Sequence, residues 1–217
     1  MSWLQLNDIM VKTYTIILFS LIFIHSCQQP SKNAFADYKA ITQTLTNVKK
    51  TLANHNDFVL NSLNNKLSDP QTNMKATIWY PRARYVQHLS SELLTFIQSL
   101  EHTLTQALAI DQHATQPVKD LLYEKKMVDT LKAKLFQFRL ELRSVDPEIK
   151  TNFETDLNDS QDKEIQEFLT SVFRNAPVVK AISILAKLET DVLLLENKIL
   201  RFCDIKVPEI DRSEFRI

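Results

Sequence analysis

Residues 177–203 read PVVKAISILAKLETDVLLLENKILRFC, and this stretch decides the fold class. Its main apolar residues recur at alternating steps of three and four, which is the spacing of one face of an α-helix. Ile184, Leu193 and Leu194 lie beside that seam and widen the apolar face. A helix with so wide an apolar face is predicted to be the most buried one of its domain.

The composition agrees with a helical fold, because the 217 residues contain no glycine. Glycine-rich phosphate loops, dinucleotide-binding turns and the nucleophile elbow of hydrolases all need glycine, so these enzyme classes are excluded. Tight hairpins and β-bulges also rely on glycine, whereas helices lose nothing without it. The composition therefore predicts an all-α chain.

The charges balance, with 26 basic and 26 acidic residues. Binding to nucleic acid through its phosphates needs clustered Lys and Arg in excess. We therefore expect no nucleic-acid partner, and the length suits a single folded domain.

Three segments before the quoted stretch also show the helical spacing of apolar residues. The first spans 35–67, the second has Pro81 in its first turn, and the third opens with Pro117 and ends before Asp146. A short helix is expected over 161–174. Together these segments predict an elongated antiparallel four-helix bundle with an extra short helix before the last one.

An acidic segment precedes the short helix. Residues 146–167 carry eight acidic and two basic residues, whereas residues 119–143 carry seven basic and four acidic ones. A solvated acidic loop followed by the short helix is the expected interpretation, and an acidic docking site is the alternative.

The amino-terminal segment has the pattern of a secretory signal. Residues 14–24 form an apolar run of eleven residues after Lys12, and such a run is too short to span a bilayer, which takes about 20 residues. The sequence Ile-His-Ser-Cys that ends at Cys27 resembles a bacterial lipobox, in which the cysteine is lipidated. An uncleaved membrane anchor is the alternative, and Met1 and Met10 both stay open as the start.

The predicted organisation follows from these segments. Residues 1–26 are a lipoprotein-type signal peptide, 27–34 comprise the lipidated Cys27 and a tether, 35–205 form the helical bundle domain, and 206–217 form a C-terminal tail.

No pattern in the sequence predicts catalysis, a cofactor or a metal site. Inward Glu-x-x-His pairs, H-E-x-x-H and C-x-x-C are all absent from the sequence. His88 and Glu92 share a helix face, but two ligands alone make no site. His55 is expected to be a hydrogen-bonded core or interface residue, and Cys203 a small buried hydrophobic residue. We therefore expect a protein that is not an enzyme.

Two groups of residues are candidates for a partner surface. Trp79, Tyr80, Arg82 and Arg84 combine aromatic and basic side chains, and the alternative is a hinge that packs against the bundle end with its arginines solvated. The second group is Ile184, Leu193 and Leu194 of the last helix, which we call the off-seam strip. Within an isolated bundle some of that strip is expected to face water, which is typical of a dimer interface.

Residues 173–192 read FRNAPVVKAISILAKLETDV, followed by Glu196 and Leu200. This progression resembles the last helix of the N-terminal helical domain of the GldM family of gliding-motility proteins. The proline before Arg82 and the run LLTFIQSL over 93–100 also resemble the second helix of that family. The likeness covers roughly residues 35–203.

The resemblance implies a periplasmic helical bundle that dimerises in the shaft of the type IX secretion and gliding machinery of Bacteroidetes. GldM itself enters the inner membrane through a transmembrane helix beside a proton-driven partner, and β-rich domains follow its bundle. This sequence instead shows a lipobox-like signal and no such β-rich domains.

We therefore expect a non-enzymatic, lipid-anchored, periplasm-facing envelope protein of the outer membrane. It would act through protein contacts, as a homodimer and with envelope protein partners, in an accessory or structural role. Two alternatives stay open: an uncleaved inner-membrane subunit of a motor or secretion system, and a helical binding module for a small envelope ligand.

Overall fold

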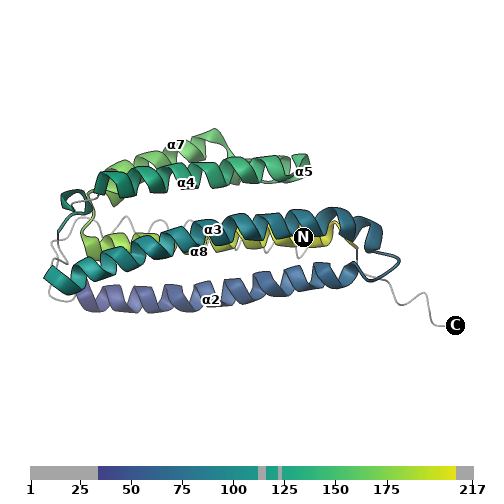
Figure 1. The fold of residues 1–217 in the computed structure, drawn as a ribbon, viewed down its shortest axis with the longest axis horizontal. Coiled ribbons are helices and arrows are strands. Elements are labelled where there is room, and N and C mark those ends of the chain that lie inside the picture. Colours follow the sequence, from purple (N-terminus) through teal and green to yellow (C-terminus); the bar gives the residue numbers. More distant parts are fainter. Residues whose placement is uncertain (1–33, 112–115, 122–123, 209–217) are drawn as a thin grey trace, which may run out of the picture. The chain divides into compact units, whose positions relative to one another are not determined.

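The computed structural model describes residues 34–111, 116–121 and 124–208 (Figure 1). The chain divides into two units, residues 1–37 and residues 38–217, and the second unit contains nearly all of the described residues. The predicted signal peptide, Cys27 and the tether up to residue 33 lie outside the described residues, as does most of the predicted C-terminal tail.

Four long helices dominate the described part of the chain. They are α2 (Ala34–Lys66), α3 (Asn73–Asp111), α4 (Glu124–Val145) and α8 (Val178–Ile205). Shorter elements connect them, namely the 3-10 turn η1 (Val118–Asp120), α5 (Pro147–Asn152), α6 (Glu154–Leu157), α7 (Asp159–Phe168) and the π-helical turn η2 (Leu169–Phe173). The described residues contain no β-strand, and the predicted all-α fold is confirmed.

Helices α3 and α8 form the centre of the second unit. They pack along one another and run antiparallel, because Trp79 near the start of α3 contacts Phe202 near the end of α8. Helix α4 packs on α3, and α2 lies along α8 (Figure 1). Fourteen of the 28 residues of α8 are buried, which confirms the prediction that this helix is the most buried of the long ones.

Helices α2 and α8 run parallel, since Lys49 contacts Glu189 and Lys66 contacts Asp204 further along both helices. A bundle of four helices in which each one reverses the direction of the last would place its first and last helices antiparallel. Helices α2 and α8 are parallel instead because the segment from α5 to η2 runs back along α4 before α8 begins. The contact between Arg139 of α4 and Asp162 of α7 lies in this additional layer. The chain therefore makes five passes, with the fifth beside the first.

The predicted start of the second helix is wrong, because α3 begins at Asn73 and contains Pro81 in its interior. A proline there removes one helical hydrogen bond. Ala76 and Trp79 precede Pro81 in the same helix, and both are buried in the core, where they hold the first turns of α3 in place. Core packing of this segment thus outweighs the local preference of proline for a helix start.

The predicted start of the third helix is also wrong, because α4 begins at Glu124. The preceding residues pair with the segment before α8 instead. The amide of Val118 donates to the carbonyl of Ala176 at 2.9 Å, and the amide of Val178 donates to the carbonyl of Gln116 at 2.9 Å. These bonds form an isolated bridge between Pro117 and Pro177.

The acidic segment is largely helical, which corrects the prediction of a loop over residues 146–160. The side chain of Asp146 caps α5 by accepting from the amide of Glu148 at 2.8 Å, and Asn158 caps α7 by accepting from the amide of Gln161 at 2.9 Å. These caps satisfy amides at helix starts and so allow short helices to follow one another.

Candidate functional site

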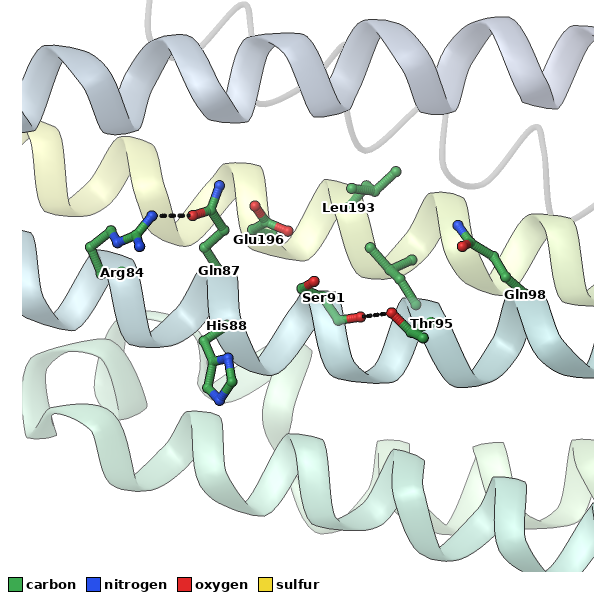
Figure 2. Close-up of a pocket in the computed structure, with 9 residues that line it drawn as sticks. Arg84, Gln87, His88, Ser91, Thr95, Gln98, Leu193 and Glu196 are labelled. Carbon is green, nitrogen blue, oxygen red and sulfur yellow. Dashed lines mark hydrogen bonds between the residues drawn. The ribbon is translucent and has the colours of Figure 1, made fainter.

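A polar groove of about 440 Å³ lies between α3 and α8 (Figure 2). Seven of its lining residues come from α3, between Arg84 and Gln98, and Leu193 and Glu196 come from α8. The α3 residues recur at steps of three and four and therefore share one face of that helix. The groove is thus a product of helical spacing in α3 and of the packing of α3 on α8.

The carboxyl group of Glu196 is the buried acidic group of this groove. The residue is only 4% exposed, and Figure 2 shows it beside Gln87 and Ser91 of α3. Burial raises the pKa of Glu196 to about 7, and the nearby charge of Asp57 acts in the same direction. The nearby polar side chains of Ser90 and Asn56 oppose this rise in pKa without cancelling it.

A buried amide network joins α2 to α8 next to the groove. The side-chain amide of Asn56 donates to the carbonyl of Leu193 at 3.2 Å, and the amide of Asn197 donates to the side-chain oxygen of Asn56 at 2.7 Å. Both asparagines are buried, so their bonds to each other avoid the cost of unpaired polar groups. Part of the contact between α2 and α8 is therefore polar.

A second carboxyl cluster connects three helices. Lys49 of α2 lies 2.8 Å from Glu189 of α8 and 4.0 Å from Glu101 of α3. Burial, together with the neighbouring carboxyl group of Glu189, raises the pKa of Glu101 to about 7 against the opposing charge of Lys49. Lys49 therefore contacts the carboxyl groups of both Glu101 and Glu189.

The two raised pKa values predict that the domain loses stability as the pH rises. Both carboxyls have an ordinary pKa of 4.5 and a folded pKa of about 7, so the folded state binds more protons between these values. The free energy of unfolding is therefore largest below the unfolded pKa and falls as the pH rises through the folded pKa. The loss is about 3 kcal/mol for Glu196 and less for the more exposed Glu101.

Urea unfolding over a series of pH values measures this loss. Glu196→Gln is expected to flatten the profile, because an amide cannot ionise. The matched control is Glu92→Gln, which changes a carboxyl that is 65% exposed on α3 and is expected to leave the profile unchanged. A stability that rises across this pH range, or equal profiles in all three proteins, would contradict the assignment.

The first predicted partner surface is not one continuous surface. Trp79 is buried in the core and contacts Phe202 edge-on at 5.7 Å. Arg82 lies over the Trp79 ring at 4.9 Å and binds Asp146 at 2.8 Å, so it is paired rather than solvated. Tyr80 is half-buried against the core, and Arg84 is exposed and lines the groove. The burial of Trp79 agrees with the alternative of a hinge that packs within the bundle, and a partner role for this group stays a prediction.

The off-seam strip of the last helix is also mostly internal. Ile184 and Leu193 are each 7% exposed, so they are not the residues of this strip that face water. Helix α8 has packing partners on more than one side, and these cover the broad apolar face. Leu194 is half-buried and keeps part of its surface accessible.

The remaining candidate residues show no reactive geometry. His55 is exposed and stacks on Phe58 at 6.3 Å, which corrects the expectation of a core or interface position within the chain. Cys203 is buried, as predicted, and burial raises its pKa to about 12, so the thiol stays protonated. Among the described residues, no three His, Cys, Asp or Glu side chains are placed to hold a metal ion.

The acidic segment binds basic side chains of the same chain. Asp162 contacts both Arg139 and Arg143 of α4, and the other ion pairs of the segment are Arg82–Asp146, Lys206–Glu148, Lys198–Asp156 and Arg143–Asp159. These internal pairs leave fewer free carboxylates for docking. No expectation from the sequence included this pairing, although the opposite charges of the two neighbouring segments are a signal that could have indicated it.

Comparison with known proteins gives a family for most of the chain. The model of the GldM N-terminal domain matches residues 35–203, and no curated protein matches. No helix in the described part of the chain combines the length and the hydrophobicity that a membrane crossing requires. Because the match covers well over half of the chain, the protein belongs to the family of the GldM N-terminal domain.

Proposed function

We propose that this protein is a non-enzymatic, lipid-anchored component of the bacterial cell envelope that acts through protein contacts. Its role is accessory or structural to the type IX secretion and gliding machinery. The observation that carries the proposal is the match of residues 35–203 to the N-terminal domain of GldM, which works in that machinery in the cell envelope.

The lipobox-like sequence supports the anchor. It ends at Cys27, after an apolar run that is too short to span a bilayer. Lipidation there would hold the helical domain on the periplasmic side, and we assign it to the outer membrane. The polar residues between Cys27 and the domain would act as the tether.

The anchor is tested by Cys27→Ala. We expect this change to block processing of the signal and to abolish the added acyl mass, because the thiol that carries the lipid is missing. The intact mass of the membrane-extracted protein measures both effects. The matched control is Cys203→Ala, which removes the buried thiol and is expected to leave lipidation unchanged. Normal cleavage and membrane retention of Cys27→Ala would overturn the lipid anchor. A wild-type protein of full-length, unacylated mass would favour the uncleaved inner-membrane subunit.

Self-association is the second part of the proposal, since the family resemblance implies a dimer. Leu194 is the residue of the off-seam strip that keeps accessible surface. Leu194→Glu is expected to weaken self-association by at least about tenfold and to change folding less, because a charge is costly in a dry interface and tolerable on a wet surface.

Sedimentation equilibrium of the domain measures that change, and Leu140→Glu on α4 is the matched control, since Leu140 is 44% exposed on a different helix. A monomeric wild-type protein would contradict the dimer. A Leu194→Glu protein that fails to fold would show that this side chain belongs to the core.

The groove between α3 and α8 favours one further candidate function, a helical module that binds a ligand of the envelope. The groove has the volume of a small-molecule site and contains a buried carboxyl group, Glu196. Both functions are compatible, because a structural protein also uses polar grooves to select its partners.

A further inference from the structure

The carboxyl group of Glu196 lacks a balancing positive charge. Among the described residues, no lysine, arginine or histidine forms an ion pair with it, and the neighbouring groups that shift its pKa are Ser90, Asn56 and Asp57. A buried carboxylate is stable only when it is paired, hydrogen-bonded or neutralised by a proton. At neutral pH, Glu196 is therefore a group that a cation from outside the chain would stabilise.

Arg84, the arginine that lines the groove, bonds to a residue other than Glu196. Its guanidinium donates to the side-chain oxygen of Gln87 at 3.0 Å (Figure 2). The side-chain amide of Gln87 in turn donates to Asp57 of α2 at 3.0 Å. These bonds hold Arg84 and Gln87 to one another at the rim. Asp57 adds a second negative charge on the same side, which increases the attraction for a cation.

The walls of the groove match a cation that is carried on a chain of methylene groups. Leu94 is half-buried and Leu193 is buried, and both line the groove together with Glu196. Lysine and arginine pack their methylene stems on apolar surface while the charged head reaches a polar group. A bare metal ion would instead need several oxygen ligands, and the described residues hold no such cluster.

We propose that the groove between α3 and α8 binds a lysine or arginine side chain of a partner protein, with its stem on Leu94 and Leu193 and its charge on Glu196. Hydroxyl and amide groups of Ser91, Thr95 and Gln98 line the same groove and would bond to the backbone of the bound segment. The positive charge of the ligand follows from the groove itself. That the ligand belongs to a partner protein rests on the function proposed above.

Binding of a short peptide to the isotope-labelled domain tests the proposal. The probe is acetyl-Ala-Lys-Ala-amide, its uncharged control contains norleucine in place of lysine, and spermidine represents a free polyamine. Backbone amide NMR shifts are followed at about pH 8, where Glu196 is ionised given its pKa of about 7. We expect saturable shifts confined to residues 84–98 and 193–197 with the lysine peptide, and none with the norleucine peptide.

Two variants assign the contact. Glu196→Gln is expected to weaken binding of the lysine peptide by at least about tenfold, because it removes the charge and retains the shape. Glu92→Gln removes an exposed carboxyl from α3, the other helix of the groove, and is expected to leave binding unchanged. Ser91→Lys places an ammonium within the groove, and we expect it to block the peptide.

Three outcomes overturn the proposal. They are the absence of local shifts, an equal loss of binding in Glu92→Gln and Glu196→Gln, and binding of spermidine without binding of the lysine peptide, which would assign the groove to free polyamines. Tighter binding of the lysine peptide than of spermidine supports a protein partner. None of these results depends on the lipid anchor or on self-association, so failure of this site is distinguishable from failure of the proposed function.

Discussion

Asp162→Ala is expected to lower the free energy of unfolding by about 3–5 kcal/mol, because it leaves two arginines without their shared carboxylate. Asp162 is 9% exposed at its side chain and bonds to Arg139 and Arg143, whose side chains are 8% and 15% exposed. Burial alone would raise the pKa of Asp162, but the hydrogen bonds and charges of the two arginines outweigh burial and lower it. The ion pairs thus favour the ionised carboxylate in the folded state.

Urea unfolding of both proteins at neutral pH measures this loss. The matched control is Asp159→Ala, since Asp159 also pairs with Arg143, at 3.3 Å, but is 91% exposed. An exposed pair of this kind contributes at most about 1 kcal/mol. Equal losses in the two variants would contradict a special role for the buried network. The pH dependence has a defined sign: stability from Asp162 is present above its unfolded pKa and is lost as the pH falls through its lowered folded pKa.

Leu185→Ala is expected to lower the free energy of unfolding by about 2–5 kcal/mol, because it leaves a cavity in the core. Leu185 is fully buried in α8, and α8 packs on α3. The loss is a large part of the usual stability of a domain, about 5–15 kcal/mol.

Chemical unfolding at several protein concentrations separates this loss from any effect on self-association. Leu140→Ala provides the control, since this leucine of α4 is 44% exposed and its truncation creates no closed cavity. A loss below about 1 kcal/mol for Leu185→Ala would show that the surrounding helices collapse into the space, and it would contradict the central position of α8.

The last helix could be predicted from sequence because its signals are local. Pro177 precedes α8 directly, and the apolar spacing continues without interruption to its end at Ile205. The all-α class could be predicted from the absence of glycine, which helices do not need. Helices also form through hydrogen bonds between residues that are close in sequence, so their signals are local. Local chemistry and the final structure agree in these elements.

The candidate groove could not be predicted, because its residues come together only through packing. Glu196 lies on α8 and Gln87 on α3, more than one hundred residues apart in sequence. Trp79 illustrates a second limit: the sequence groups it with the basic residues Arg82 and Arg84, but α3 begins earlier than predicted and the ring lies in the core. Pro81 led to a wrong prediction of where α3 begins, because a proline inside a helix is tolerated where buried neighbours hold the helix.

The parallel course of α2 and α8 has a mechanical consequence. A pull between the beginning of α2 and the end of α8 would act on their interface along the helix axes, which is a shear geometry. The contacts Lys49–Glu189, Asn56–Leu193 and Lys66–Asp204 follow one another along that interface. Under shear these contacts bear the load together, whereas antiparallel helices pulled from the same end would unzip one contact at a time. A domain built in this way resists extension through its first and last helices.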